Sequence, residues 1–168
     1  MATHASRDTT TGHKFEEKVY IGGRGIDLSQ GKLRDYFEEH FPHLLFSFSR
    51  IGNYNKDKEK FLNGAEVVIS KELKPDEAYF DPEQLTLDIY EKKTQHCGGS
   101  VDEKLQTCGF KIAEYRNIGK YLGVPPENVH YIYILDSWFD PETTPRYQDS
   151  LNYIKATDGC DYVIIKDE

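Results

Sequence analysis

The sequence predicts an α/β fold in which a mixed central β-sheet is flanked by helices. Residues 85–95 alternate between apolar and polar side chains, as a half-buried strand does. Residues 129–135 form a nearly continuous apolar run, which is typical of a central strand. Between them, residues 100–122 show helical spacing of apolar side chains. We therefore expect two parallel strands that are joined by a right-handed helical crossover.

The other elements follow from caps, breakers and apolar spacing. Ser29 is a suitable N-cap for one helix, and Ser100 with Glu103 forms a capping box for another. Pro75 and Pro82 predict a long turn. In chain order we expect a helix at 15–21, a helix at 29–41, a strand at 44–49, a charged loop at 53–60, a strand at 65–70, a turn at 71–84, a helix at 146–155 and a strand at 162–165.

The composition predicts one soluble domain. The 168 residues, 38% of them hydrophobic, can form a single core. We expect a disordered N-terminal segment at 1–11 and one domain at 12–168, with neither an apolar signal block nor a membrane span. Three cysteines without metal-ligand spacing favour reduced thiols and a cytoplasmic location. The formal net charge of −8 disfavours extended nonspecific phosphate binding, although a cleft can still be basic.

The end of the strand at 85–95 indicates a functional site. Its apolar face carries Leu85, Leu87 and Ile89 and then continues as Glu91, Lys93 and Gln95. Burying a carboxylate and an ammonium is costly unless both find partners. A carboxylate and a lysine two residues apart, near a further acidic group, can bind a divalent metal and a phosphate. This pattern favours a metal-dependent nuclease.

The second carboxylate is predicted from strand pairing. We take strands 65–70 and 85–95 to pair antiparallel, which puts Glu66 opposite Glu91 at about 5 Å. Asp76 and Asp81 would then lie near the hairpin tip, far from Glu91 at about 3.3 Å per residue. Glu66 and Glu91 are therefore the predicted metal ligands, and Asp81 remains the alternative to Glu66.

Two such carboxylates repel each other unless a cation lies between them. Lys93 supplies one positive charge, and Mg²⁺ would supply more. Glu16 or Glu17 on the first predicted helix could also reach the site. The competing interpretation is an ordinary cross-strand ion-pair network of Glu66, Glu91 and Lys93.

The run Glu91-Lys92-Lys93-Thr94-Gln95, followed by residues 99–106, resembles type II restriction endonucleases of the PD-(D/E)XK superfamily. The resemblance covers residues 12–155 and implies a restriction-endonuclease-like fold. It implies that Glu91 is the acidic metal ligand and Lys93 the catalytic lysine. Glu66 takes the place of the family's first acidic residue, commonly an aspartate, and Glu16 resembles a helix glutamate of some members. The implied DNA contacts are Gln95, Lys104, Gln106 and Lys111.

The resemblance implies hydrolysis of DNA phosphodiester bonds with Mg²⁺, for which Mn²⁺ could substitute. Symmetric cleavage of double-stranded DNA needs two sites, so we expect a homodimer or a cleavage subunit of a larger nuclease. Two alternatives stay open: a nonspecific repair nuclease, and a non-catalytic acidic protein that binds or inhibits a basic partner. The net charge of −8 favours the second alternative. A preference for DNA over RNA is also left open.

Overall fold

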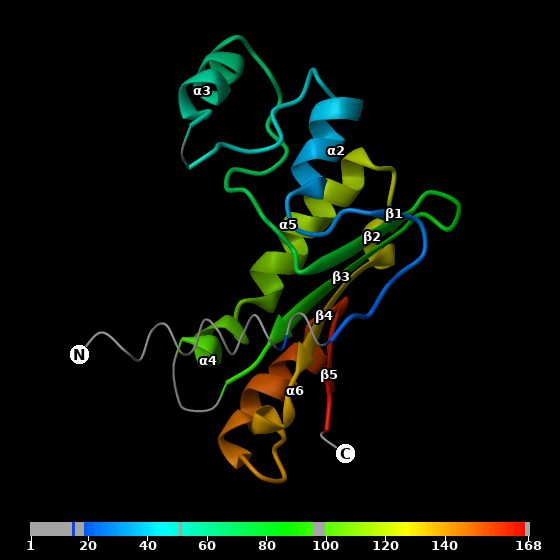
Figure 1. Ribbon diagram of the computed structural model, residues 1–168, viewed down its shortest axis with the longest axis vertical. Coiled ribbons are helices and arrows are strands. Elements are labelled where there is room, and N and C mark those ends of the chain that lie inside the picture. Colours follow the sequence, from blue (N-terminus) through cyan, green and yellow to red (C-terminus); the bar gives the residue numbers. More distant parts are fainter. Residues whose placement is uncertain (1–14, 16–18, 51, 96–99, 167–168) are drawn as a thin grey trace, which may run out of the picture.

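The computed structural model describes residue 15 and residues 19–50, 52–95 and 100–166. These residues form a five-stranded mixed β-sheet with helices packed against it (Figure 1), which confirms the predicted α/β class. The segment 1–11, for which disorder was predicted, lies outside the described residues. None of the helices in the described part of the chain is long and apolar enough to cross a membrane.

The sheet has the strand order β1-β2-β3-β4-β5. The pairings β1–β2 and β2–β3 are antiparallel, whereas β3–β4 and β4–β5 are parallel. The parallel pairing of β3 with β4 confirms the expected crossover. The strands are β1 (Ile26–Asp27), β2 (Glu77–Asp81), β3 (Thr86–Lys93), β4 (Val129–Leu135) and β5 (Cys160–Ile164).

Helix α5 packs on β4, and α6 packs on β5. Figure 1 shows α3 and α6 at opposite ends of the molecule's long axis. The α-helices are α2 (Lys32–His40), α3 (Tyr54–Leu62), α4 (Val101–Lys104), α5 (Cys108–Tyr121) and α6 (Gln148–Ala156). Short 3-10 helices occupy Pro126–Asn128, Ser137–Phe139 and Pro145–Tyr147.

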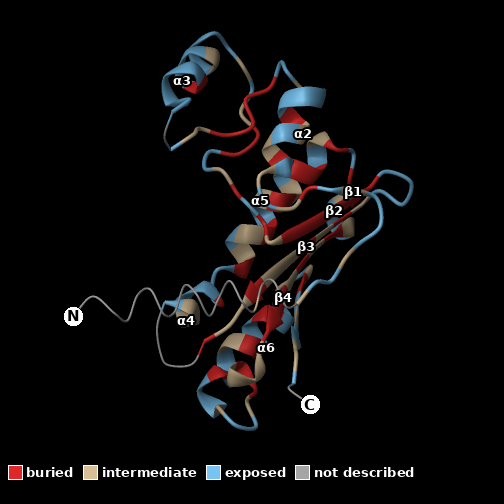
Figure 2. Cartoon of the chain, in the orientation of Figure 1, coloured by how far each residue is buried: buried red, intermediate tan, exposed pale blue. Residues whose placement is uncertain are grey.

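The core lies between the sheet and α5. Leu87 and Ile89 of β3 have no exposed surface, and Ile112 and Ile118 of α5 are buried with them. The residues between them on β3 are more exposed, so the alternation predicted for residues 85–95 is confirmed over residues 86–90. It was wrong at Leu85, which precedes the strand and is exposed, and at Lys92, which is buried. Figure 2 shows that β2, by contrast, is buried along its whole length.

Two predictions about the helices were wrong. Residues 53–60 were expected to be a charged loop, but residues 54–60 lie in α3, where Lys and Glu are good helix formers. The Asp57 carboxylate attaches this helix to α2 and to the segment before α3. It accepts hydrogen bonds from the Arg34 guanidinium and from the Ser49 N–H. The helix expected at 100–122 divides into α4 and α5, and the Ser100 side chain makes no cap hydrogen bond.

Two predicted strands and their pairing were also wrong. Residues 44–49 and 65–70 meet each other in two isolated parallel bridges, Leu45 with Val67 and Phe48 with Lys71. The partner of β3 is instead β2, which lies inside the predicted turn at 71–84. Tertiary pairing overrode local preference here, since the more apolar segment at 65–70 found a different partner.

The β2–β3 hairpin closes through the turn at residues 82–85. The ring of Pro82 fixes the backbone φ angle at the first position of this turn. The Asp81 carboxylate accepts hydrogen bonds from the N–H groups of Glu83 and Gln84, as an Asx turn does. Asp81 therefore stabilises the turn.

A buried ion pair fastens β2 to β3 on one face of the sheet. Lys92 Nζ lies 2.6 Å from Glu77 Oε2, and the two side chains are 5% and 4% exposed. The Glu77 carboxylate also accepts hydrogen bonds from the N–H groups of Ile21 and Gly22 and from the Tyr79 hydroxyl. Burial alone would raise the pKa of Glu77, but Lys92 and the other donors together lower it. This network attaches residues 19–25 to the sheet.

Glu77→Ala should lower the free energy of unfolding by roughly 3–5 kcal/mol, because it removes the carboxylate paired with the buried Lys92 ammonium. Urea denaturation measures the change. Glu83→Ala, at an exposed position of the adjoining turn, is the control and should change stability by less than about 0.5 kcal/mol. Equal effects of the two substitutions would show that the buried ion pair does not stabilise the hairpin.

Candidate functional site

Asp76 and Glu91 lie together at the end of the β2–β3 hairpin. Glu77 is paired with Tyr90, so the next residue on each strand brings Asp76 opposite Glu91. Asp76 Oδ2 accepts a hydrogen bond of 2.7 Å from the Lys92 N–H, and the Asp76 and Glu91 carboxyls share another. The carboxylate that the structure places beside Glu91 is therefore Asp76, and the predicted pairing of Glu66 with Glu91 was wrong.

Lys93 completes a carboxylate–lysine cluster with these two residues. It follows Glu91 by two positions and so lies on the same face of β3. Its Nζ is 3.7 Å from Glu91 Oε2, and the Lys93 and Glu91 side chains are 21% and 14% exposed. The prediction that Glu91 and Lys93 share one face of the strand is confirmed. Lys92 points to the other face and pairs with Glu77.

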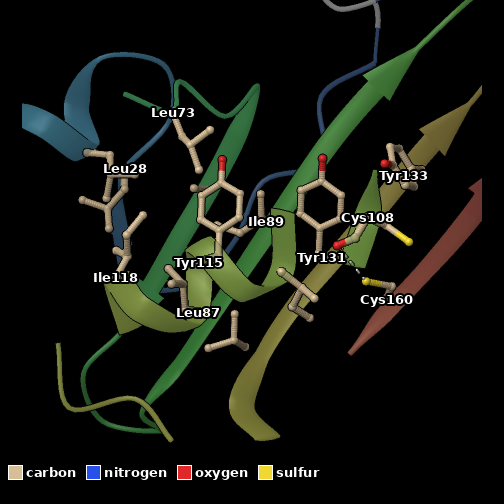
Figure 3. Close-up of a cluster of buried hydrophobic side chains, with 14 of the residues drawn as sticks. Leu28, Leu73, Leu87, Ile89, Cys108, Tyr115, Ile118, Tyr131, Tyr133 and Cys160 are labelled. Carbon is tan, nitrogen blue, oxygen red and sulfur yellow. Dashed lines mark hydrogen bonds between the residues drawn. The ribbon is translucent and has the colours of Figure 1, made fainter. Parts of the chain in front are cut away.

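Glu91 and Lys93 line a cavity of about 280 Å³. Its other walls come from the segment before β2, from α4 and α5, and from β4. Figure 3 shows the rings of Tyr115 and Tyr131 side by side, with both hydroxyls pointing the same way. The remaining lining residues are Glu72, Leu73, Lys74, Lys104, Thr107, Lys111 and Tyr133.

The cavity is basic although the protein is acidic. Four lysines line it against two glutamates, and one of these, Glu72, lies 3.8 Å from the Arg34 guanidinium. The whole chain has a formal net charge of −8. Cations gathered in a cleft attract anions locally even where the exterior is acidic. The charge of the chain therefore does not exclude a phosphate-bearing ligand.

The pKa of the Glu91 carboxyl is raised well above its usual value. Burial raises its pKa most, the Asp76 charge raises it further, and Lys93 and Lys111 offset part of this, which leaves a value of about 8. At neutral pH the Glu91 carboxyl is therefore mostly protonated when no cation is bound. A bound divalent cation would favour the ionised form and displace that proton.

The stability of the metal-free protein should fall as pH rises through about 8. Glu91 titrates near 4.5 when unfolded and near 8 when folded. Between these values the folded state holds a proton that the unfolded state has released, so unfolding becomes easier as pH rises. Urea denaturation in EDTA across this range measures the effect.

Glu91→Gln should flatten this part of the pH profile, because glutamine cannot titrate. Glu103→Gln changes an exposed carboxyl on α4 and should leave the profile unchanged. If wild type and Glu91→Gln show the same slope, the carboxyl pair does not hold a raised pKa.

The structure does not bring Glu66 to the cluster. Its carboxylate accepts a hydrogen bond of 2.6 Å from the Tyr121 hydroxyl at the end of α5. Tyr121 is ten residues, or about 15 Å, along the helix from the cavity residue Lys111. Asp81, the alternative ligand, is five residues from Asp76 along β2, which is about 16 Å.

The predicted DNA-contacting residues divide into two groups. Lys104 and Lys111 line the cavity. Gln106 is exposed but is not part of the cavity lining. Gln95 is buried, and its Nε2 donates to Asp102 Oδ1 at 3.4 Å, so it helps to hold α4. Glu16 and Glu17 lie outside the described residues.

Two carboxylates are sufficient for the metal that the pattern predicts. Among residues 15, 19–50, 52–95 and 100–166, no three His, Cys, Asp or Glu side chains gather closely enough to hold a metal. Mg²⁺ keeps several waters and is commonly bound by one or two carboxylates together with substrate phosphates. The oxygen donors of Asp76 and Glu91 therefore fit Mg²⁺ or Mn²⁺.

Sequence patterns could have identified two features that were missed. Pro75-Asp76 stands fifteen residues before Glu91, and a turn at Pro82 would have centred the hairpin correctly. Thr107 and Tyr115 follow the predicted Lys104 and Lys111 at helical spacing, which could have placed them at the same wall.

Comparison of the chain with protein-family models, with curated proteins and with solved structures gives no match. The function is therefore inferred from the geometry and chemistry of the site alone.

Proposed function

We propose that this protein is a metal-dependent nuclease that hydrolyses phosphodiester bonds in double-stranded DNA. The main support is the pairing of Asp76 with Glu91, with Lys93 on the same face, beside a lysine-lined cavity. With Asp76 as the first acidic residue, Pro75-Asp76 and Glu91-Lys92-Lys93 are similar to the PD-(D/E)XK pattern in both parts. A restriction-endonuclease-like fold belongs to the same proposal.

Asp76 and Glu91 would hold the metal, which when bound polarises a phosphate and lowers the pKa of a water molecule. Lys93 donates hydrogen bonds to the attacking water or to the phosphate oxygen on which charge develops. Lys104 and Lys111 attract the DNA backbone into the cavity. The protonated Glu91 of the metal-free state loses its proton before the site is competent.

A duplex cut on both strands requires two such sites, so we propose a homodimer or a cleavage subunit of a larger nuclease. Sequence-specific cleavage of the type II restriction kind would give discrete fragments, and a repair nuclease would give a smear. The buried, unpaired thiols of Cys108 and Cys160 are compatible with a reducing cytoplasm.

The main alternative is an acidic protein that binds a basic partner without catalysis. The net charge of −8 favours it. The carboxylate–lysine cluster is harder to reconcile with it, because a binding protein has no need to bury two carboxyls against each other.

Purified protein should cleave plasmid DNA with Mg²⁺ and not with EDTA. Asp76→Asn and Glu91→Gln should each lower the cleavage rate by at least about 100-fold, because each removes one metal-binding charge. Glu66→Gln is the matched control, since that carboxylate contacts Tyr121 away from the site, and it should retain activity.

Lys93→Ala should cause a comparable loss while leaving stability largely intact. Lys120→Ala, at an exposed position of α5, is the suitable lysine control, because Lys92 is held in the buried pair with Glu77. Wild-type protein that binds Mg²⁺ but leaves DNA intact would contradict the nuclease proposal and favour the binding protein.

A further inference from the structure

One face of α4 and α5 presents hydrogen-bond donors to the cavity. Lys104, Lys111 and Tyr115 line it, at intervals of seven and four residues. We call these three residues the donor face. Helix α5 begins directly after Thr107, whose hydroxyl donates to the Lys104 carbonyl at 2.8 Å. The positive end of the helix dipole lies at the same wall.

Tyr115 is the unusual member of the donor face. The residue is only 1% exposed. Within the described ranges 19–50, 52–95 and 100–166 its hydroxyl makes no hydrogen bond to another residue, and Tyr115 lines the cavity. The neighbouring Tyr133 hydroxyl is engaged, since it donates to the Lys104 carbonyl at 2.8 Å. No fully buried side-chain nitrogen or oxygen in the described part of the chain lacks a partner, so the Tyr115 hydroxyl is reached from the cavity. It is therefore available to donate to a ligand there.

The chemistry of the walls defines that acceptor. It must receive hydrogen bonds from a hydroxyl and from the ammonium groups of Lys104 and Lys111, which requires several anionic oxygens. Burial, and then the charges of Glu91 and Asp76, raise the pKa of Tyr115, so its hydroxyl keeps its proton and can only donate to an anion. A tetrahedral phosphate group meets these requirements.

We propose that the donor face binds the phosphate group that is cleaved, and that Tyr115 donates its hydroxyl hydrogen to one non-bridging oxygen. This inference rests on the proposed nuclease function and identifies how its substrate is held. Tyr115 packs against Tyr131 with ring centroids 5.8 Å apart, so its hydroxyl is fixed before substrate binds. Figure 3 shows Tyr115 of α5 beside Tyr131 of β4. The carboxylate pair then acts from the strand side, and the donors hold the phosphate from the helix side.

Tyr115→Phe removes the hydroxyl and keeps the ring. It should weaken binding of inorganic phosphate, measured by calorimetry in EDTA, by about 10- to 100-fold, as expected for one hydrogen bond to a charged group. The DNA cleavage rate should fall by a similar factor, and Mg²⁺ affinity should stay within about twofold. Tyr54→Phe, on exposed α3, is the control and should change none of these quantities.

The outcomes separate this inference from the proposed function. DNA cleavage by wild type with unchanged phosphate binding and cleavage in Tyr115→Phe would overturn the role of Tyr115 and leave the nuclease intact. Phosphate binding that depends on Tyr115, without DNA cleavage, would retain the phosphate site and remove the nuclease. Wild type that neither binds phosphate nor cleaves DNA would remove both. If Tyr115→Phe fails to fold, Lys111→Gln should give the same loss of phosphate affinity, and unchanged affinity there would overturn the inference.

Discussion

The register between β2 and β3 is the constraint on which the site depends. Pairing of Glu77 with Tyr90 brings the next residues, Asp76 and Glu91, together at the end of the hairpin. Because successive strand residues point to opposite faces, the same register joins Glu77 to Lys92 on the other side. A slip by one residue would move each carboxylate to the wrong face. One hairpin therefore sets both the structural ion pair and the site.

The two faces of the β2–β3 hairpin differ in how their buried carboxylates are paired. Glu77 receives Lys92, a hydroxyl and two backbone N–H groups, so its charge is fully satisfied. Glu91 faces Asp76, and its nearest cation is 3.7 Å away. Such an arrangement is unfavourable in isolation and must be offset by stability elsewhere. The satisfied pair behind it supplies that support, because it ties the same two strands together.

The acidity of the chain and the basicity of the cavity are compatible. Lysines of β3, α4 and α5 converge on one volume, and the acidic residues are spread over the rest of the protein. An anionic exterior disfavours nonspecific adhesion to DNA. A backbone phosphate would then bind where its charge is matched, next to the carboxylate pair.

The sequence was sufficient to predict the elements with strong local patterns. The alternating strand β3, the apolar strand β4, their parallel crossover and the shared face of Glu91 and Lys93 were all predicted. Pairing of distant segments was not predictable in this way. Strand β2 is short, lies between two prolines and is buried on both faces, so it has no alternation to reveal it. The more apolar segment at 65–70 was taken as the partner of β3 instead. For that reason Glu66, and not Asp76, was predicted as the second carboxylate.

The central claim is that Asp76 and Glu91 form one metal-binding centre beside Lys93. Anomalous X-ray diffraction from crystals of the protein soaked in Mn²⁺ tests it most directly. We expect a single strong Mn²⁺ peak between the two carboxylates, with metal–oxygen distances of about 2.1–2.2 Å. A peak at Glu66, or no peak near Asp76 and Glu91 at saturating Mn²⁺, would contradict the account.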